Sequence, residues 1–125
     1  MLESRGHLRY SIEGKANIKP DDEPSRTISA DLVDVCSTGV AVRANEKIET
    51  EASVSFELII KQCDKPIPGK GKVKYLKEVK EGGDIFFRIG IQFIDVDKEE
   101  IRFIIAHIHG KTYVENRKKP PKPYR

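Results

Sequence analysis

The chain has 125 residues, of which 38% are hydrophobic and 34% charged, a composition typical of one soluble globular domain. It contains no apolar run long enough to cross a bilayer and no signal-peptide pattern, so we expect a cytoplasmic protein without membrane insertion. Residues 111–125 carry six basic and one acidic side chains, a net of +5 that leaves −2 for the rest, since the total is +3. The body is therefore not a basic nucleic-acid-binding domain, and no DNA partner is expected.

The first half of the chain alternates between apolar and polar residues in several short runs. Alternation predicts a half-buried strand over residues 10–18, and the two prolines and three acids of 19–26 predict a loop. Strand patterns follow at 27–35 and 40–44, before a charged connection at 46–51. This half therefore predicts three strands separated by polar loops.

The alternating pattern continues into the second half of the chain. Residues 52–60 predict a strand, 61–69 a loop, and 69–79 another strand with Val73 and Tyr75 pointing inward. The letters EGGD at 81–84 are typical of a hairpin turn, and residues 85–93 then give the longest alternation in the chain.

The periodicity changes after these strands. Isoleucines at 101, 104, 105 and 108 form one apolar stripe of a helix over 97–110. Asp97 and Glu100 resemble a capping box at its start, and Gly110 is the expected stop. The tail beyond it, with three prolines, should be extended or disordered.

These elements predict one fold class. Strands that follow one another without intervening helices cannot build a doubly wound sheet, so we expect a small six-stranded antiparallel β-barrel with a C-terminal amphipathic helix. The predicted domain covers 1–110, with a lead-in at 1–9, the barrel at 10–95 and the helix at 97–110, followed by the basic, proline-rich tail at 111–125.

Two arginines precede the first predicted strand. Arg5 and Arg9 lie four residues apart in a polar lead-in. Guanidinium groups are planar, permanently charged forks that suit phosphate oxygens or the O6/N7 edge of guanine. The chain has eight arginines, so a pair at this spacing is equally compatible with ordinary surface charge.

A second short segment, DVCSTGVAV at 34–42, places a carboxylate, small polar residues and a glycine between two strands. In structural terms Gly39 and Asp34 would shape a turn or bulge. In functional terms a carboxylate accepts the N1–H and N2–H groups of guanine, and a glycine lets a ligand approach the backbone. The segment alone is compatible with both interpretations.

Together the two segments resemble the signature of the PilZ domain, RxxxR followed by (D/N)xSxxG. The stretches GKGKVKYL at 69–76 and GIQF at 90–93 also resemble a late barrel strand of that family and the segment before its C-terminal helix. The resemblance covers residues 4–110. It implies the split β-barrel fold of PilZ domains, with the same C-terminal helix.

The resemblance also implies a function, that of a bacterial receptor for the second messenger cyclic di-GMP, without enzymatic activity and without a cofactor. Arg5 and Arg9 would then contact the phosphates and the Hoogsteen edges of the guanines. Asp34 would face a guanine amine edge, and Gly39 would leave room for the ring. The effector would be another protein, from motility, pilus, secretion or polysaccharide machinery.

Two positions depart from the family pattern. Cys36 replaces the serine, and losing one neutral hydrogen bond costs about 1 kcal/mol, or several-fold in affinity. The hydroxyl of Ser37 is a further candidate contact, although alternation points it the other way. Ser4 stands where many relatives have another arginine, which puts a third basic contact in doubt and favours one bound ligand molecule over two.

Other functions find less support in the sequence. Cys36 and Cys63 are far apart, and His107 and His109 diverge on a helix, so neither a disulfide nor a metal site is expected. The main alternative is a PilZ-fold interaction adaptor that no longer binds nucleotide. Single-strand nucleic-acid binding would need exposed aromatic residues, whereas most aromatic residues of this chain are expected to point inward. Three alternatives stay open for the tail, which is solvated and inert, contacts the ligand's phosphates, or contacts an acidic partner or nucleic acid.

Overall fold

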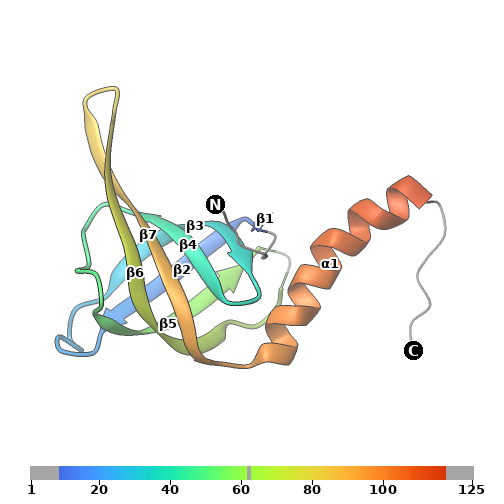
Figure 1. The fold of residues 1–125 in the computed structure, drawn as a ribbon, viewed down its shortest axis with the longest axis horizontal. Coiled ribbons are helices and arrows are strands. Elements are labelled where there is room, and N and C mark those ends of the chain that lie inside the picture. Colours follow the sequence, from blue (N-terminus) through green and yellow to red (C-terminus); the bar gives the residue numbers. More distant parts are fainter. Residues whose placement is uncertain (1–8, 62, 118–125) are drawn as a thin grey trace.

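A computed structural model describes residues 9–61 and 63–117, with the side chains of the last helix described as far as Ile108. In these ranges the chain forms seven antiparallel strands and one helix (Figure 1). They are β1 (Tyr10–Ser11), β2 (Gly14–Pro20), β3 (Ile28–Cys36), β4 (Gly39–Ala44), β5 (Ser53–Ile60), β6 (Ile67–Glu81), β7 (Asp84–Val96) and α1 (Lys98–Arg117).

The sheet closes on itself. Its strand order is β1-β3-β2-β5-β6-β7-β4, and β3 also pairs with β4, which joins the two ends of the order. Strands β2 to β7 thereby form a closed barrel, and β1 is a short extra strand paired with β3. The prediction of a six-stranded antiparallel barrel followed by one helix is confirmed.

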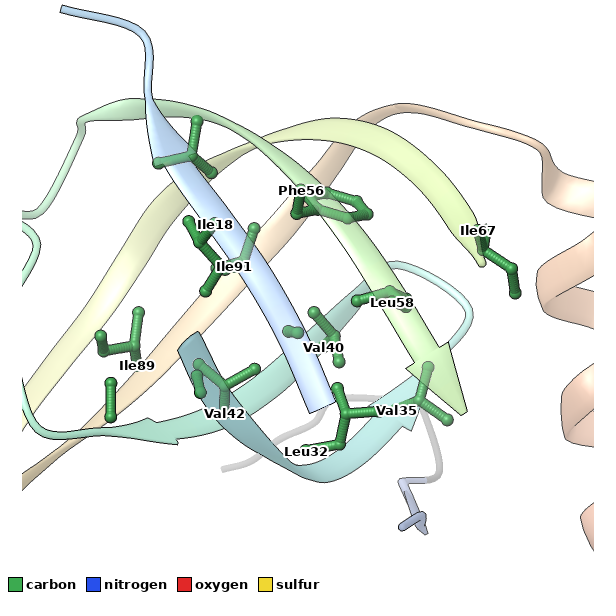
Figure 2. Packing of buried hydrophobic residues seen from close by; sticks show 14 of the residues in the cluster. Ile18, Leu32, Val35, Val40, Val42, Phe56, Leu58, Ile67, Ile89 and Ile91 are labelled. Carbon is green, nitrogen blue, oxygen red and sulfur yellow. The ribbon is translucent and has the colours of Figure 1, made fainter. Parts of the chain in front are cut away.

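The core fills the interior of this barrel. Side chains of Ile18, Phe56, Leu58, Ile89 and Ile91, from the three strands β2, β5 and β7, lie together inside it (Figure 2). They are buried because alternate residues of each strand face inward, which is the alternation that the sequence displays. No charged or polar side chain among the described residues is fully buried.

The predicted strand at 10–18 is divided into two. Its alternation holds, since Ile12, Ala16 and Ile18 are all buried, but pairing is interrupted before β2 begins at Gly14. Gly14 has a φ of +148°, and a Cβ there would collide with the carbonyl oxygen of Ile59. A glycine is therefore required where the first residue of β2 pairs closely with the end of β5.

Strand β6 contains a bulge that reverses one sequence-based expectation. Its register with β7 shifts between Val73 and Tyr75, so Lys74 is one extra residue. Val73 is fully buried as expected, but Tyr75 is 51% exposed and lies on the outer face. The expected inward position of Tyr75 is wrong, because a bulge moves every later residue of the strand to the opposite face.

Strands β6 and β7 also form a hairpin that extends beyond the rest of the barrel (Figure 1). Its turn lies at 82–83, where both glycines have positive φ, so the hairpin turn predicted from EGGD is confirmed. Ile85, the first residue of the long alternation, is 51% exposed because the hairpin there has no opposing barrel wall.

Helix α1 begins as predicted and ends later. The Asp97 carboxylate accepts hydrogen bonds from the backbone N–H groups of Glu99 (3.0 Å) and Glu100 (3.2 Å), which caps the helix. Ile101 and Ile104 are buried against the barrel. The helix continues past Gly110 to Arg117, so the expected stop is wrong; one glycine costs a helix only about 1 kcal/mol. No described helix is long and apolar enough to span a bilayer.

Candidate functional site

A cleft of about 420 Å³ lies on the outer face of the barrel, over β3, β4, β7 and β6. This volume is typical of small-molecule sites. Four of the residues singled out in the sequence line it, namely Arg9, Asp34, Cys36 and Gly39. The two sequence segments that suggested a site are therefore brought together at one place.

Strand register gives the cleft a flat floor. One row of directly opposed residues crosses the four strands and consists of Asp34, Ala41, Gly90 and Tyr75. The two central members are the smallest side chains available, so the sheet surface between the carboxylate and the phenol ring is low and open. A planar ring can approach the backbone there.

Gly39 belongs to the adjacent row, opposite Cys36 on β3 and Gln92 on β7. A Cβ at position 39 would lie 2.5 Å from the carbonyl oxygen of Ile91, which is too close for any side chain. The close approach of β4 to β7 therefore requires glycine at this position, whatever the cleft binds.

Arg9 lies immediately before β1 and connects the lead-in to β3. Its Nε donates to Oδ1 of Asp34 at 2.8 Å, and its Nη2 lies 2.8 Å from the same oxygen in an ion pair. Its Nη1 also lies 3.7 Å from Sγ of Cys36. The Arg9 side chain is 47% exposed and that of Asp34 20% exposed, so the ion pair lies at the mouth of the cleft. Asp34 thereby fixes the direction in which the guanidinium points.

Three of the predicted site residues remain to be placed. Ser4 and Arg5 lie outside the described residues, and Ser37 is exposed in the turn between β3 and β4. The hydroxyl beside the cysteine comes from Thr38 instead, whose Oγ1 is 3.4 Å from Sγ of Cys36. Its carbonyl oxygen accepts a hydrogen bond of 2.8 Å from the Phe93 N–H, which ties this turn to β7.

The sequence did not identify the residues that β6 and β7 contribute to the cleft. Lys74, Tyr75 and Arg88 all line it. Lys74 is the bulge residue, and Tyr75 was expected inward. Arg88 occupies a polar position in the long alternation, which was the one available sign that it faces outward. The Nε atom of Arg88 is buried and has no hydrogen-bond partner among the described residues.

Lys74 is held by an acid at the rim. Its Nζ lies 3.0 Å from Oε2 of Glu51, and Lys72 lies 3.7 Å from the other oxygen of the same carboxylate. The hydrogen bond from Lys74, with the positive charge behind it, keeps the pKa of Glu51 below its ordinary value. This rim lysine is thus already compensated.

The thiols and acids offer little else for chemistry. Cys36 and Cys63 are both free, and burial, with the nearby charge of Glu100, raises the pKa of the Cys63 thiol. The part of the chain that the structure describes has no group of three or more His, Cys, Asp or Glu side chains arranged to hold a metal ion.

Known structures share this fold. The PilZ domain of YcgR from Escherichia coli, solved with c-di-GMP, matches with a TM-score of 0.69 at 15% identity, over 94% of this chain and 99% of that one. MrkH from K. pneumonia in complex with c-di-GMP gives 0.73 at 15% identity, over 95% of this chain and 56% of that one. The Bacillus subtilis inhibitor of motility MotI/DgrA gives 0.69 at 10% identity, over 94% and 55%.

The chain thus spans nearly all of the YcgR PilZ domain and about half the length of MotI/DgrA and MrkH. At these identities the likeness shows the fold alone. No curated protein sequence matches the chain. The family model for the PilZ domain, however, matches residues 3–110, which is most of the sequence. The chain therefore belongs to the PilZ domain family.

Proposed function

We propose that this protein is a non-enzymatic receptor for cyclic di-GMP that binds the dinucleotide in the cleft on the outer face of the barrel. The observation that carries the proposal is the convergence of the Arg9 guanidinium, the Asp34 carboxylate and the low floor of Ala41 and Gly90. Solved PilZ relatives with the same nucleotide bound support it.

The ligand carries two phosphates and two guanines, and each part has a matching group. Arg9 offers charge-assisted donors to a phosphate oxygen or to the guanine O6/N7 edge. Because Asp34 already holds this guanidinium in position, less side-chain entropy is lost when the ligand binds. The same carboxylate is the acceptor for the guanine N1–H and N2–H groups.

Arg5 and Cys36 complete the proposed contacts. Arg5, outside the described residues, would bring a second guanidinium from the lead-in to the phosphates. Cys36 stands where the family has serine, beside Thr38 and below Arg9. Ser4 in place of a further arginine favours one ligand molecule per chain.

The output of the receptor is a change in its lead-in that a protein partner recognises. Charge-assisted bonds to the ligand fix the arginine-bearing segment and the nucleotide together, and the surface so formed differs from that of the free protein. Cyclic di-GMP is a bacterial messenger, so the receptor would act in a bacterial cytoplasm. The candidate partners are motility, pilus, secretion or polysaccharide machinery.

Titration calorimetry of cyclic di-GMP into the purified protein tests the proposal, with GMP and cyclic AMP as controls. We expect micromolar or tighter binding of the dinucleotide, loss of that binding in Arg9→Ala, and no comparable heat from the controls. Absence of binding by a correctly folded protein would overturn the proposal.

One observation favours a second function. Cys36 in place of serine weakens a hydrogen-bonding position of the motif, as in an interaction adaptor whose nucleotide site has been lost. Under that hypothesis the calorimetric titration is silent while the barrel still captures a protein partner, and Cys36→Ser does not create nucleotide binding.

A further inference from the structure

Three cationic side chains lie side by side on the outer face of the barrel, beside the cleft. Arg88 of β7 is directly opposite Arg43 of β4 on one side and Lys77 of β6 on the other. Residues opposed in this way have Cβ atoms about 5 Å apart, and like charges at that spacing destabilise a sheet. These three residues, the cationic row, therefore need an explanation.

Three other cations at or near the cleft are each paired with an acid. Their ion pairs, measured between nitrogen and carboxylate oxygen, are Arg9–Asp34 (2.8 Å), Lys74–Glu51 (3.0 Å) and Lys72–Glu51 (3.7 Å). No ion pair of this kind joins the cationic row to an acid within residues 9–61 and 63–117. The positive charge of the cationic row thus remains uncompensated.

The immediate surroundings keep these charges in place without cancelling them. Asp31 of β3 is opposite Arg43, but its carboxylate binds Lys15 at 2.6 Å. The guanidinium carbon of Arg43 lies 3.8 Å from the centre of the Phe86 ring, and this stacking orients the group while leaving its charge intact. An anion that approaches from outside would meet a fixed cation.

Arg88 connects the cationic row to the cleft. Its side chain lines the cleft, and its buried Nε–H has no acceptor among the described residues. Buried polar groups are nearly always hydrogen-bonded, and a missing partner is often a ligand or an ion. Along the strand, Arg88 is two residues from Gly90, so it stands next to the floor on which a ring would lie.

We propose that the cationic row is a second phosphate-binding subsite of the cleft. The Nε–H of Arg88 donates to a phosphate oxygen, and Arg43 and Lys77 supply charge on either side. Arg9 serves another phosphate at the Asp34 end of the floor. The inference rests on the proposed function, and the bound phosphate belongs either to the same nucleotide or to a second nucleotide molecule.

The Nε–H signals of arginine in ¹⁵N-labelled protein test the subsite directly, with Arg88→Lys used to assign the Arg88 signal. We expect that signal to shift on addition of cyclic di-GMP and, in a separate titration, of inorganic phosphate. Binding of cyclic di-GMP with no shift at Arg88 overturns the subsite and leaves the proposed function intact. A shift with inorganic phosphate in a protein that does not bind cyclic di-GMP preserves the subsite and removes the proposed function.

A charge-matched pair of variants gives the second measurement. Arg88→Gln should weaken cyclic di-GMP binding by about tenfold or more and reduce its dependence on salt. Lys19→Gln removes the same charge from an exposed side chain of β2, on the other side of the barrel, and this variant should bind like the wild type. Equal affinities of Arg88→Gln and the wild type overturn the proposal. If Arg88→Gln does not fold, the shift of the Arg88 Nε–H signal in the wild-type protein tests the subsite instead. Calorimetry also gives the stoichiometry. One nucleotide per chain means that both phosphates belong to the same nucleotide, and two nucleotides per chain mean that the phosphate at Arg88 belongs to the second molecule.

Discussion

Two arginines of this barrel differ in how fully their donors are used. Arg26, in the loop before β3, donates to Glu23 at 2.8 Å, to Glu46 at 3.2 Å and to the carbonyl oxygen of Lys47 at 3.2 Å. The hydrogen bond to Glu23, followed by that to Glu46, raises the pKa of Arg26. Arg88, on β7, has a buried Nε with no partner among the described residues.

The difference separates a structural arginine from one available to a ligand. Arg26 joins two loops and has little left to offer, whereas Arg88 retains both its charge and a donor beside a cleft. Arg9 is intermediate, since Asp34 occupies two of its donors and nearly half of the side chain is exposed. The number of arginines in the sequence does not separate the two kinds, whereas the hydrogen-bond acceptors around each guanidinium group do.

The largest effect is expected at Arg9. Arg9→Ala should weaken cyclic di-GMP binding by about a hundredfold or more, because at least two charge-assisted bonds are lost. The melting temperature should change by less than about 3 °C, since the Arg9–Asp34 pair is substantially exposed. Calorimetry and thermal unfolding measure the two quantities. A large drop in melting temperature with unchanged affinity would put Arg9 in the same class as Arg26.

The floor between Arg9 and Arg88 gives the next effect. A Cβ at Gly90 would lie 3.1 Å from the Cβ of Tyr75, and a valine would raise the floor into the cleft. Gly90→Val should therefore weaken nucleotide binding by about tenfold or more. Asn17→Val, on the outer face of β2 across the barrel, is the control. If both variants bind like the wild type, the ring does not lie on this floor.

A smaller gain is expected from Cys36→Ser. A hydroxyl is a better acceptor for the Nη1 of Arg9 than the sulfur that now lies 3.7 Å away. Binding should tighten several-fold, measured against Cys63→Ser, which changes the thiol that lies outside the cleft. Weaker binding would mean that the thiol has a role of its own.

Arg26→Ala should leave nucleotide affinity unchanged and lower the melting temperature by no more than about 5 °C, because its ion pairs are largely exposed. Differential scanning fluorimetry with and without cyclic di-GMP measures both. Lost affinity would break the distinction drawn between Arg26 and the arginines of the cleft.

The smallest effect concerns acid stability. The pKa of Glu51 is lowered chiefly by its hydrogen bond from Lys74, so its contribution to stability is present above the pKa of the unfolded chain. That contribution is lost as the pH falls through the lower pKa of the folded protein. Glu51→Gln should flatten the acid side of a plot of unfolding midpoint against pH. An unchanged plot would show that the Lys74–Glu51 pair is energetically neutral.

The barrel was predictable because the alternation of apolar and polar residues along each strand identifies the side chains of its core. A period of two identifies the inward face of each strand, and closing the sheet then requires only that those faces meet. The errors are local. The bulge at Lys74 could not be seen, because the polar and apolar residues around it fit two registers equally well, and Tyr75 was assigned to the wrong face.

The site was predictable where it is local in sequence. Asp34, Cys36 and Gly39 lie within six residues, and Arg9 reaches them because β1 pairs with β3. The side chains of β6 and β7 could not be found, since their position beside β4 depends on how the barrel closes. No short-range pattern encodes that pairing. Arg5 remains a prediction outside the described residues.

Closure by the last strand also orders events during synthesis. β4 acquires one neighbour early, through its hairpin with β3, but its other edge stays unpaired until β7 has left the ribosome. Gly90 and Arg88 arrive with that strand, so a nascent chain that ends before Gln92 lacks part of the cleft lining. Unpaired edges are the positions at which chains aggregate, and pairings between distant segments form slowly. A ligand of this cleft would therefore stabilise finished barrels and no earlier intermediate.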